Sequence, residues 1–288
     1  MAFTPEQQRL IAETTKYTDL LEKRVAHALG TKRQKVEVKR HTYIYSPPGL
    51  GKTFAVLQAA EKHGIEMIKI QGAASLNAIV TQLACAAYMI KTGPIVVWID
   101  DCDSIFTHLE GLNVMKGALD EERNVLAWNK NLTIQIQNYT ASSSKADKLK
   151  GEALKAFQQP GSVGVEVPTD RMRFIITSNR SLTAPSMPLT TSKKVHEAAI
   201  RDRVNYYAID LTAKQSWGWG ANVLMDSDML GLTKAQKEKL LHWMYAHWGR
   251  LPGNSLRTVK DYAAAMLNSP DDYESEWEAT LLKVQEAA

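Results

Sequence analysis

The chain has 288 residues, 44% of them hydrophobic and 23% charged, which is enough for one large domain or two smaller ones. Its net charge of +4 permits a nucleic-acid partner without arguing strongly for one. No apolar run is long enough to span a bilayer, and the N-terminal sequence MAFTPEQQRL lacks the pattern of a secretion signal. Two cysteines, Cys85 and Cys102, make no disulfide framework, so we expect small buried thiols in a reducing cytoplasm.

The N-terminal segment, residues 5–29, is predicted to be a helix. Its apolar residues recur with helical spacing, Thr4 is placed to cap it, and Pro5 suits its first turn. The following TKRQKVEVKRH carries five Lys/Arg against one Glu. A solvated connector is the favoured interpretation of that run, and a phosphate-binding patch is the alternative.

Between residues 41 and 211, five short apolar runs alternate with helical segments. The runs are TYIY, IEMIKI, IVVWI, RFIIT and NYYAI. Consecutive apolar positions are typical of strands covered on both faces, and strands that alternate with helices predict a parallel α/β sheet. The polar stretch ASSSKADKLKG, residues 141–151, is predicted to be mobile.

From residue 212 onward the sequence predicts only helices. The stretches KAQKEKLLHWMYAHW and SLRTVKDYAAAML each place apolar residues on one helical face. The stretch SWGWG opens this segment with Trp217 and Trp219. These aromatic rings could stack on bases, but we favour a role in packing a hinge or clamping adenine.

A glycine-rich loop, SPPGLGKT, joins the first predicted strand to a helix that ends at Gly64. Backbone amides of such a loop can turn toward a phosphate at the positive end of the helix dipole. Lys52 would reach the outer phosphates, and the hydroxyl of Thr53 would hold Mg²⁺. Ser46 stands where a glycine usually begins this pattern, and the alternative is an ordinary strand-to-helix turn. The expected nucleotide-binding residues of the loop are Pro48, Gly49, Leu50, Gly51, Lys52, Thr53 and Phe54.

Polar residues follow two of the predicted strands. Asp100 and Asp101 end the run IVVWIDD, and Asn179 ends RFIITSN. Parallel strands bind ligands at their carboxyl ends, where Asp100 would anchor Mg²⁺ through water and Asp101 would orient or deprotonate the attacking water. Asn179 would hydrogen-bond that water or the γ-phosphate. The alternatives are acids that cap the next helix and a plain turn asparagine.

Taken together, these motifs resemble those of the AAA+ ATPases. SPPGLGKT resembles their Walker A motif, VVWIDDCDSIF their Walker B motif and IITSN their sensor 1. AAIRDRV is similar to the segment that carries the arginine finger, and GNSLRTV is similar to sensor 2 in the helical lid. The resemblance covers residues 41–267. It implies a Mg²⁺-dependent ATPase with a five-stranded parallel P-loop NTPase sheet flanked by helices, followed by a small all-helical lid domain.

The resemblance also implies roles for single residues. Asp101 stands where the family usually has a glutamate, and a carboxylate one methylene shorter implies slow hydrolysis. Arg203 is the first candidate for an arginine finger that acts in trans, and Arg201 is the second. Asn179 becomes sensor 1 and Arg257 sensor 2, whereas exposure to solvent is the alternative for Arg257.

The same resemblance implies a homo-oligomeric ring or spiral, often of six subunits. The expected domains are residues 1–40, 41–211 with an insert at about 128–170, and 212–288. Within the insert, LTIQIQNY is predicted to form a hairpin strand with GVEVP. Four lysines there, Lys145, Lys148, Lys150 and Lys155, would touch nucleic-acid phosphate or belong to a solvated loop.

Three hypotheses on function follow. The first is an ATPase that remodels a protein or nucleoprotein assembly. The loop IQGAASLN after the second predicted strand has no aromatic residue, which weakens a protein-threading role. The second hypothesis is a DNA-directed protein, such as a helicase loader or branch-migration motor. The third is a switch that binds ATP and hydrolyses it very slowly.

Overall fold

The computed structural model describes residues 2–30, 39–226, 231–251 and 255–286. The predicted basic connector falls largely on residues 31–38, which lie outside the described residues. The described strands are β1 His41–Tyr45, β2 Ile68–Gln71, β3 Ile95–Asp100, β4 Val125–Trp128, β5 Val165–Pro168, β6 Met172–Ser178 and β7 Val204–Ala208. The α-helices are α1 Pro5–Ala28, α2 Lys52–His63, α3 Leu76–Met89, α4 Leu109–Ala118, α5 Thr133–Ala141, α6 Lys145–Ala156, α7 Ser192–Arg203, α8 Ala213–Asp226, α9 Lys234–His247, α10 Leu256–Asn268 and α11 Tyr273–Glu286, with short 3-10 helices at Asp103–Phe106 and Trp248–Arg250.

The chain forms two compact units. The sheet unit comprises residues 24–45 and 56–208, and the helical unit comprises residues 1–23, 46–55 and 209–288. The glycine-rich loop is therefore grouped with the C-terminal helices, although it follows β1 directly in the chain. The predicted domain boundaries stay a prediction. Among the described helices, none combines the length and the hydropathy that a membrane span requires.

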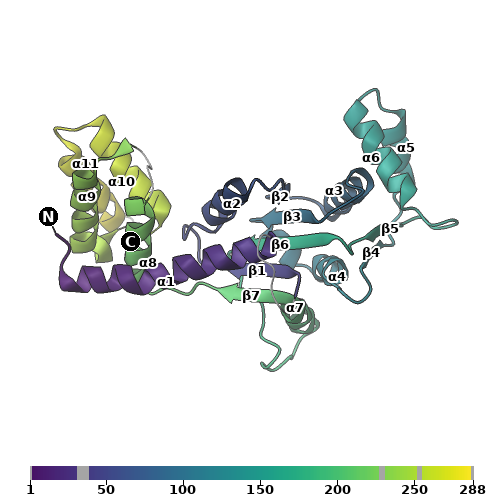
Figure 1. The fold of residues 1–288 in the computed structure, drawn as a ribbon, viewed down its shortest axis with the longest axis horizontal. Coiled ribbons are helices and arrows are strands. Elements are labelled where there is room, and N and C mark those ends of the chain that lie inside the picture. Colours follow the sequence, from purple (N-terminus) through teal and green to yellow (C-terminus); the bar gives the residue numbers. More distant parts are fainter. Residues whose placement is uncertain (1, 31–38, 227–230, 252–254, 287–288) are drawn as a thin grey trace. The chain divides into compact units, whose positions relative to one another are not determined.

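The five predicted strand runs form one parallel sheet, as predicted, and their order in it is β2-β3-β6-β1-β7 (Figure 1). All six residues of β3 are buried, which explains why this strand is a continuous apolar run. In the register of the sheet, Asp100 lies beside Gln71 of β2 and Thr177 of β6. The carboxyl ends of these neighbouring strands therefore meet at one edge.

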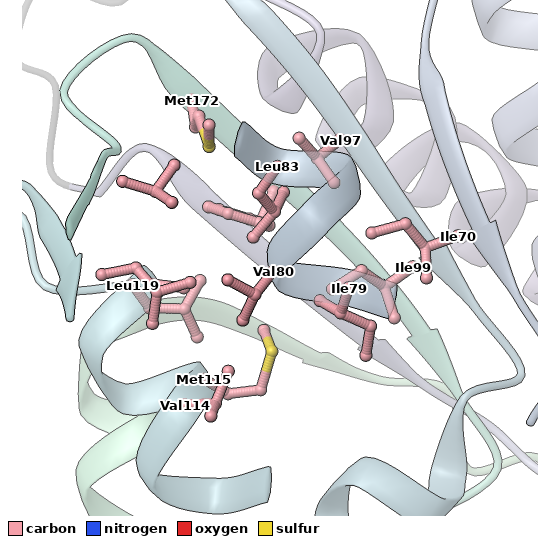
Figure 2. Packing of buried hydrophobic residues seen from close by; sticks show 14 of the residues in the cluster. Ile70, Ile79, Val80, Leu83, Val97, Ile99, Val114, Met115, Leu119 and Met172 are labelled. Atoms are coloured by element: carbon pink, nitrogen blue, oxygen red, sulfur yellow. The ribbon is translucent and has the colours of Figure 1, made fainter. Parts of the chain in front are cut away.

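The core of the sheet unit is packed from strands and helices together. Figure 2 shows Val80 and Leu83 of α3 lying with Val97 of β3 and Met115 of α4. Burial of such apolar side chains is the main stabilising contribution to the sheet that carries the site. Cys102 is buried and Cys85 half-buried, and both thiols are free. Burial raises the pKa of the Cys102 thiol to about 11, which disfavours its thiolate form.

The insert between β4 and β5 corrects the hairpin prediction. LTIQIQNY forms the helix α5 and not a hairpin strand, while β5 pairs antiparallel with β4. The predicted mobile segment contains the start of α6, which Ser144 caps by accepting a hydrogen bond from the Asp147 amide. Leu132 and Ile136 are buried at helical spacing, whereas Ile134 between them is 71% exposed. The apolar residues that alternate in the sequence therefore do not share one face. Leu132 and Ile136 lie on the buried face, and Ile134 lies on the exposed face.

The helical unit confirms the helices predicted after residue 212 and adds the first part of α1. Trp217 is buried and its indole Nε1 donates to the Leu241 carbonyl, so packing is its role and base stacking is not. Trp219 is buried as well. The Asn222 amide on α8 donates to the Ile11 carbonyl on α1, which fixes the N-terminal helix to this unit.

Candidate functional site

The glycine-rich loop between β1 and α2 uses two left-handed residues. Gly49 has a φ of 80° and Gly51 a φ of 75°, a backbone conformation that glycine adopts without steric cost. Among the residues that the structure describes, neither glycine amide has an acceptor. The loop therefore offers donors of the type that bind phosphate.

The lysine of the loop is buried and already surrounded by oxygen atoms. Lys52 is 5% exposed, and its Nζ lies 2.8 Å from both the carbonyl oxygen and the hydroxyl of Ser46. Ser46, the departure from the usual glycine, thus supplies a hydrogen-bond partner for the lysine. Of the other predicted contact residues, Leu50 is buried, Thr53 is half-buried, and Pro48 and Phe54 are exposed.

The loop contacts the first residues of α10 within the helical unit. The Leu256 amide donates to the Gly49 carbonyl at 2.9 Å. A Cβ added to Gly49 would lie 2.1 Å from Ser255 Cβ, so this approach requires glycine. Arg257, the predicted sensor 2, follows at the next position of α10 with an exposed side chain.

At the edge of the sheet, Asp100 is held by both neighbouring strands. It is 1% exposed, and its Oδ1 accepts from the Thr177 hydroxyl at 2.7 Å. That hydroxyl accepts in turn from the indole Nε1 of Trp98 at 3.0 Å. On the other side, the Gln71 amide donates to Asp100 Oδ2 at 3.5 Å. The carboxylate is thereby fixed in orientation, as a group that binds a metal through water needs to be.

Asp101 leaves the strand in a left-handed conformation with a φ of 52°. Its amide donates to the Thr177 carbonyl, and its carboxylate accepts from Asn179 Nδ2 at 3.2 Å. Asp101 is exposed, in contrast to Asp100. The structure therefore brings together Asp100, Asp101 and Asn179, the three polar residues predicted at this edge. It leaves one carboxylate buried and fixed and the other open to water.

The two candidate finger arginines end α7 and have different surroundings. Arg203 donates to the Ala199 carbonyl and forms a salt bridge with Asp120 at 3.2 Å. A backbone hydrogen bond from Arg123 lowers the pKa of Asp120, and the Arg203 pair lowers it further. Arg201 donates to the Leu182 carbonyl, and its Cζ lies 4.0 Å from the centre of the Tyr206 ring. It also lines a cavity of about 360 Å³ together with Tyr206.

An ion pair that sequence reasoning missed joins the end of β6 to α7. Arg180, the residue after Asn179, donates to Glu197 at 2.7 Å, and the Thr183 hydroxyl donates to the same carboxylate at 2.6 Å. Glu197 is 4% exposed. Burial opposes its ionisation, but the hydrogen bonds from Thr183 and Arg180 prevail and lower its pKa. The sequence signal was an acid in the middle of the helix that carries Arg201.

Gln71 and Thr177 were also missed as partners of the acidic edge. Both are polar residues at the ends of apolar runs, IEMIKIQ and RFIIT. This position at a strand end was the feature of the sequence that could have identified them as neighbours of the acidic edge. Only the strand order shows that they flank Asp100 on opposite sides.

Comparisons with known proteins support one family. The model of the "ATPase family associated with various cellular activities (AAA)" matches residues 42–197. No curated protein matches the chain. Among solved structures, it is similar to the Thermotoga maritima RuvB Holliday junction branch migration motor. That match has 15% identity and a TM-score of 0.42, over 93% of this chain and 68% of that chain.

Proposed function

Because the chain belongs to the AAA family of ATPases, we propose that it binds ATP with Mg²⁺, hydrolyses it to ADP and phosphate, and remodels a macromolecular substrate. The observation that supports this most is the acidic edge, where Asp100, Asp101 and Asn179 lie together at the ends of parallel strands. β1 of the same sheet leads directly into the glycine-rich loop. Open α/β sheets bind ligands at this edge.

The residues of the loop fit a triphosphate. The amides of Gly49 and Gly51 are donors, and Lys52 carries a positive charge that is already desolvated. The two Ser46 oxygens that lie 2.8 Å from Nζ are neutral, whereas phosphate oxygens are charged and therefore stronger acceptors. On ATP binding, the contacts of Lys52 Nζ with Ser46 would be replaced by contacts with phosphate oxygens.

Mg²⁺ fits a site shared between protein and nucleotide. Among the described side chains, no three His, Cys, Asp or Glu are placed to hold a metal ion alone. Mg²⁺ in nucleotide sites usually takes one or two protein ligands and completes its shell with phosphate oxygens and water. Asp100 and the hydroxyl of Thr53 are the proposed protein ligands. The ion would neutralise charge on the phosphates.

Asp101 is the proposed general base. Its carboxylate is open to water and is oriented by Asn179. The attacking water would give its proton to Asp101, while Asn179 holds the carboxylate in place. Since Asp101 is one methylene shorter than the glutamate usual in this family, we expect slow turnover. A switch that binds ATP and hydrolyses it very slowly is therefore the second candidate function.

Oligomerisation would complete the site through an arginine in trans. Releasing Arg203 would break its salt bridge with Asp120, whereas Arg201 is held by one carbonyl and a ring face. These contacts favour Arg201 as the arginine finger, although the sequence pattern made Arg203 the first candidate. A ring of about six subunits remains the proposed assembly.

ATP turnover in matched variants tests the ATPase proposal. Asp100→Asn keeps the shape of the side chain, and we expect it to lower turnover by about 10²-fold or more. Lys52→Ala is expected to weaken ATP binding, measured by titration calorimetry. Asp271→Asn, an exposed acid in the helical unit, is the control and should change neither quantity. ATP that fails to bind, or turnover unchanged by Asp100→Asn, would refute the proposal.

Complementation between subunits tests the finger. Arg201→Ala is expected to lower turnover by about 10³-fold. Mixed with Asp100→Asn subunits, it should regain activity, because each variant supplies the group that the other lacks. The same experiment with Arg203→Ala assigns the role to one arginine. If neither mixture recovers, action in trans is excluded.

A further inference from the structure

The insert forms a two-helix arm, residues 129–164, on the β4–β5 ribbon. A Cβ on Gly151 of α6 would lie 2.8 Å from the Thr140 hydroxyl, so glycine allows α6 to approach α5 closely. At the base, a Cβ on Gly164 would lie 2.1 Å from the Trp128 carbonyl oxygen, which fixes the crossing of the two chain segments. The arm also contacts α3, where Gln135 donates to the Thr81 hydroxyl at 3.4 Å. It therefore presents a defined surface.

The arm carries most of the excess positive charge of the protein. Residues 129–164 contain five lysines and two acids, a net charge of +3 against +4 for the whole chain. Two of the lysines are used in ion pairs, Lys130 with Glu110 and Lys150 with Asp147. The remaining three are exposed and have no acidic partner among the described residues: Lys145, Lys148 and Lys155. These three cations are available to an anionic partner.

A cavity of about 450 Å³ lies between α5 and the end of α6. Its polar lining comes from hydroxyl and amide side chains and one cation, namely Thr133, Gln137, Thr140, Gln158 and Lys155, and no carboxylate lines it. The sequence from 131 to 144 contains no charged residue at all. Ile134, on the same helix, is 71% exposed. The arm therefore combines a cavity of neutral hydrogen-bonding groups and Lys155 with an exposed apolar side chain and two further exposed lysines on α6.

We propose that the arm binds single-stranded nucleic acid as the substrate of the ATPase. Lys145, Lys148 and Lys155 contact the phosphates, and the cavity beside Gln137 receives an unstacked base. Glutamine pairs a donor with an acceptor, as base edges do, whereas an acidic peptide would need cations in place of the neutral amides. The inference rests on the proposed function, because it names the substrate class of that motor.

Fluorescence anisotropy with a labelled 30-nucleotide oligothymidylate tests the arm without ATP. Three lysines that contact phosphates of a single strand predict a linear plot of the logarithm of the association constant against the logarithm of the salt concentration. The expected slope is about −2. The triple variant Lys145→Gln, Lys148→Gln, Lys155→Gln should lose at least about tenfold in affinity and most of that slope. Gln137→Ala should weaken binding while the slope stays near that of the unmodified protein.

A charge-matched control distinguishes an effect of the arm lysines on binding from an effect of the protein's net charge. Lys16→Gln, Lys23→Gln and Lys234→Gln together remove the same charge from exposed sites outside the arm and should leave binding unchanged. Equal loss in both triple variants, or equal binding of polyglutamate, would overturn the proposal. ATP turnover without nucleic acid should be normal in the arm variant. Absent oligothymidylate binding with intact turnover refutes the arm alone, whereas binding without turnover refutes the proposed ATPase.

Discussion

The role of Asp101 can be tested by removing its charge without disturbing its backbone. Its φ of 52° lies in the left-handed region, which asparagine and aspartate tolerate better than other side chains. Asparagine also keeps an oxygen that can accept from Asn179, in place of the 3.2 Å contact that the carboxylate makes. Asp101→Asn therefore isolates the loss of a base.

The expected magnitudes separate chemistry from stability. A general base contributes about 10²–10⁴-fold, so Asp101→Asn should lower kcat by about 10²-fold or more with ATP affinity nearly unchanged. Asp101→Ala should lose the same activity, and the left-handed backbone should cost it about 1 kcal/mol of stability as well. That cost corresponds to a fall of about 2–4 °C in Tm.

The assays are steady-state hydrolysis of saturating ATP, which gives kcat, and thermal denaturation of the unmodified protein and the Asn and Ala variants side by side. Asp101→Glu provides the converse test, since it lengthens the carboxylate by one methylene and should raise kcat if reach limits the rate. An Asp101→Asn protein with kcat within threefold of the unmodified protein would refute the base assignment. Equal Tm values for the Asn and Ala variants would refute the argument from backbone conformation.

Two further predictions concern the loop and the ion pair. Gly49→Ala should abolish tight ATP binding and lower Tm, because the new Cβ would lie 2.1 Å from Ser255 Cβ. Gly64→Ala is the control for left-handed backbone strain alone, because its Cβ would have no atom within 4 Å. Glu197→Gln should lower the free energy of unfolding by about 2 kcal/mol at pH 7, measured by urea denaturation, since hydrogen bonds to charged groups are lost. The pKa of Glu197 is lowered from 4.5, so its ionised form stabilises the fold above that value and the advantage disappears as the pH falls through the lowered pKa. A difference between the two proteins that persists unchanged in acid would contradict the role given to Arg180.

The sheet was predictable because parallel strands buried on both faces leave continuous apolar runs in the sequence. The arm was not predictable in the same way. In LTIQIQNY, Leu132 and Ile136 are four residues apart, a spacing shared by a helix and by an alternating strand. The hairpin prediction required Ile134 to be buried with them. α6 packs against α5, and Ile134 is not buried in that contact but faces solvent.

The acidic edge was predictable in part. Strand ends meet at one edge of any parallel sheet, so the sequence places Asp100 and Asn179 at the same edge once both runs are recognised. The partners of Asp100 depend on strand order, because Gln71 and Thr177 are its neighbours only if β3 lies between β2 and β6. That order is a property of the whole sheet and is not encoded in any one run.

Each compact unit links a candidate nucleotide contact to a helix that bears an arginine. In the helical unit, the Gly49 carbonyl accepts from the first residue of α10, directly before Arg257. In the sheet unit, Asn179 is followed by Arg180, whose ion pair with Glu197 joins the end of β6 to α7 and its terminal arginines. A change at the loop would therefore be felt at α10, and a change at the acidic edge would be felt at α7. Such short connections would suit the proposed nucleotide-dependent change of subunit arrangement, because packed elements move as units and do not deform gradually.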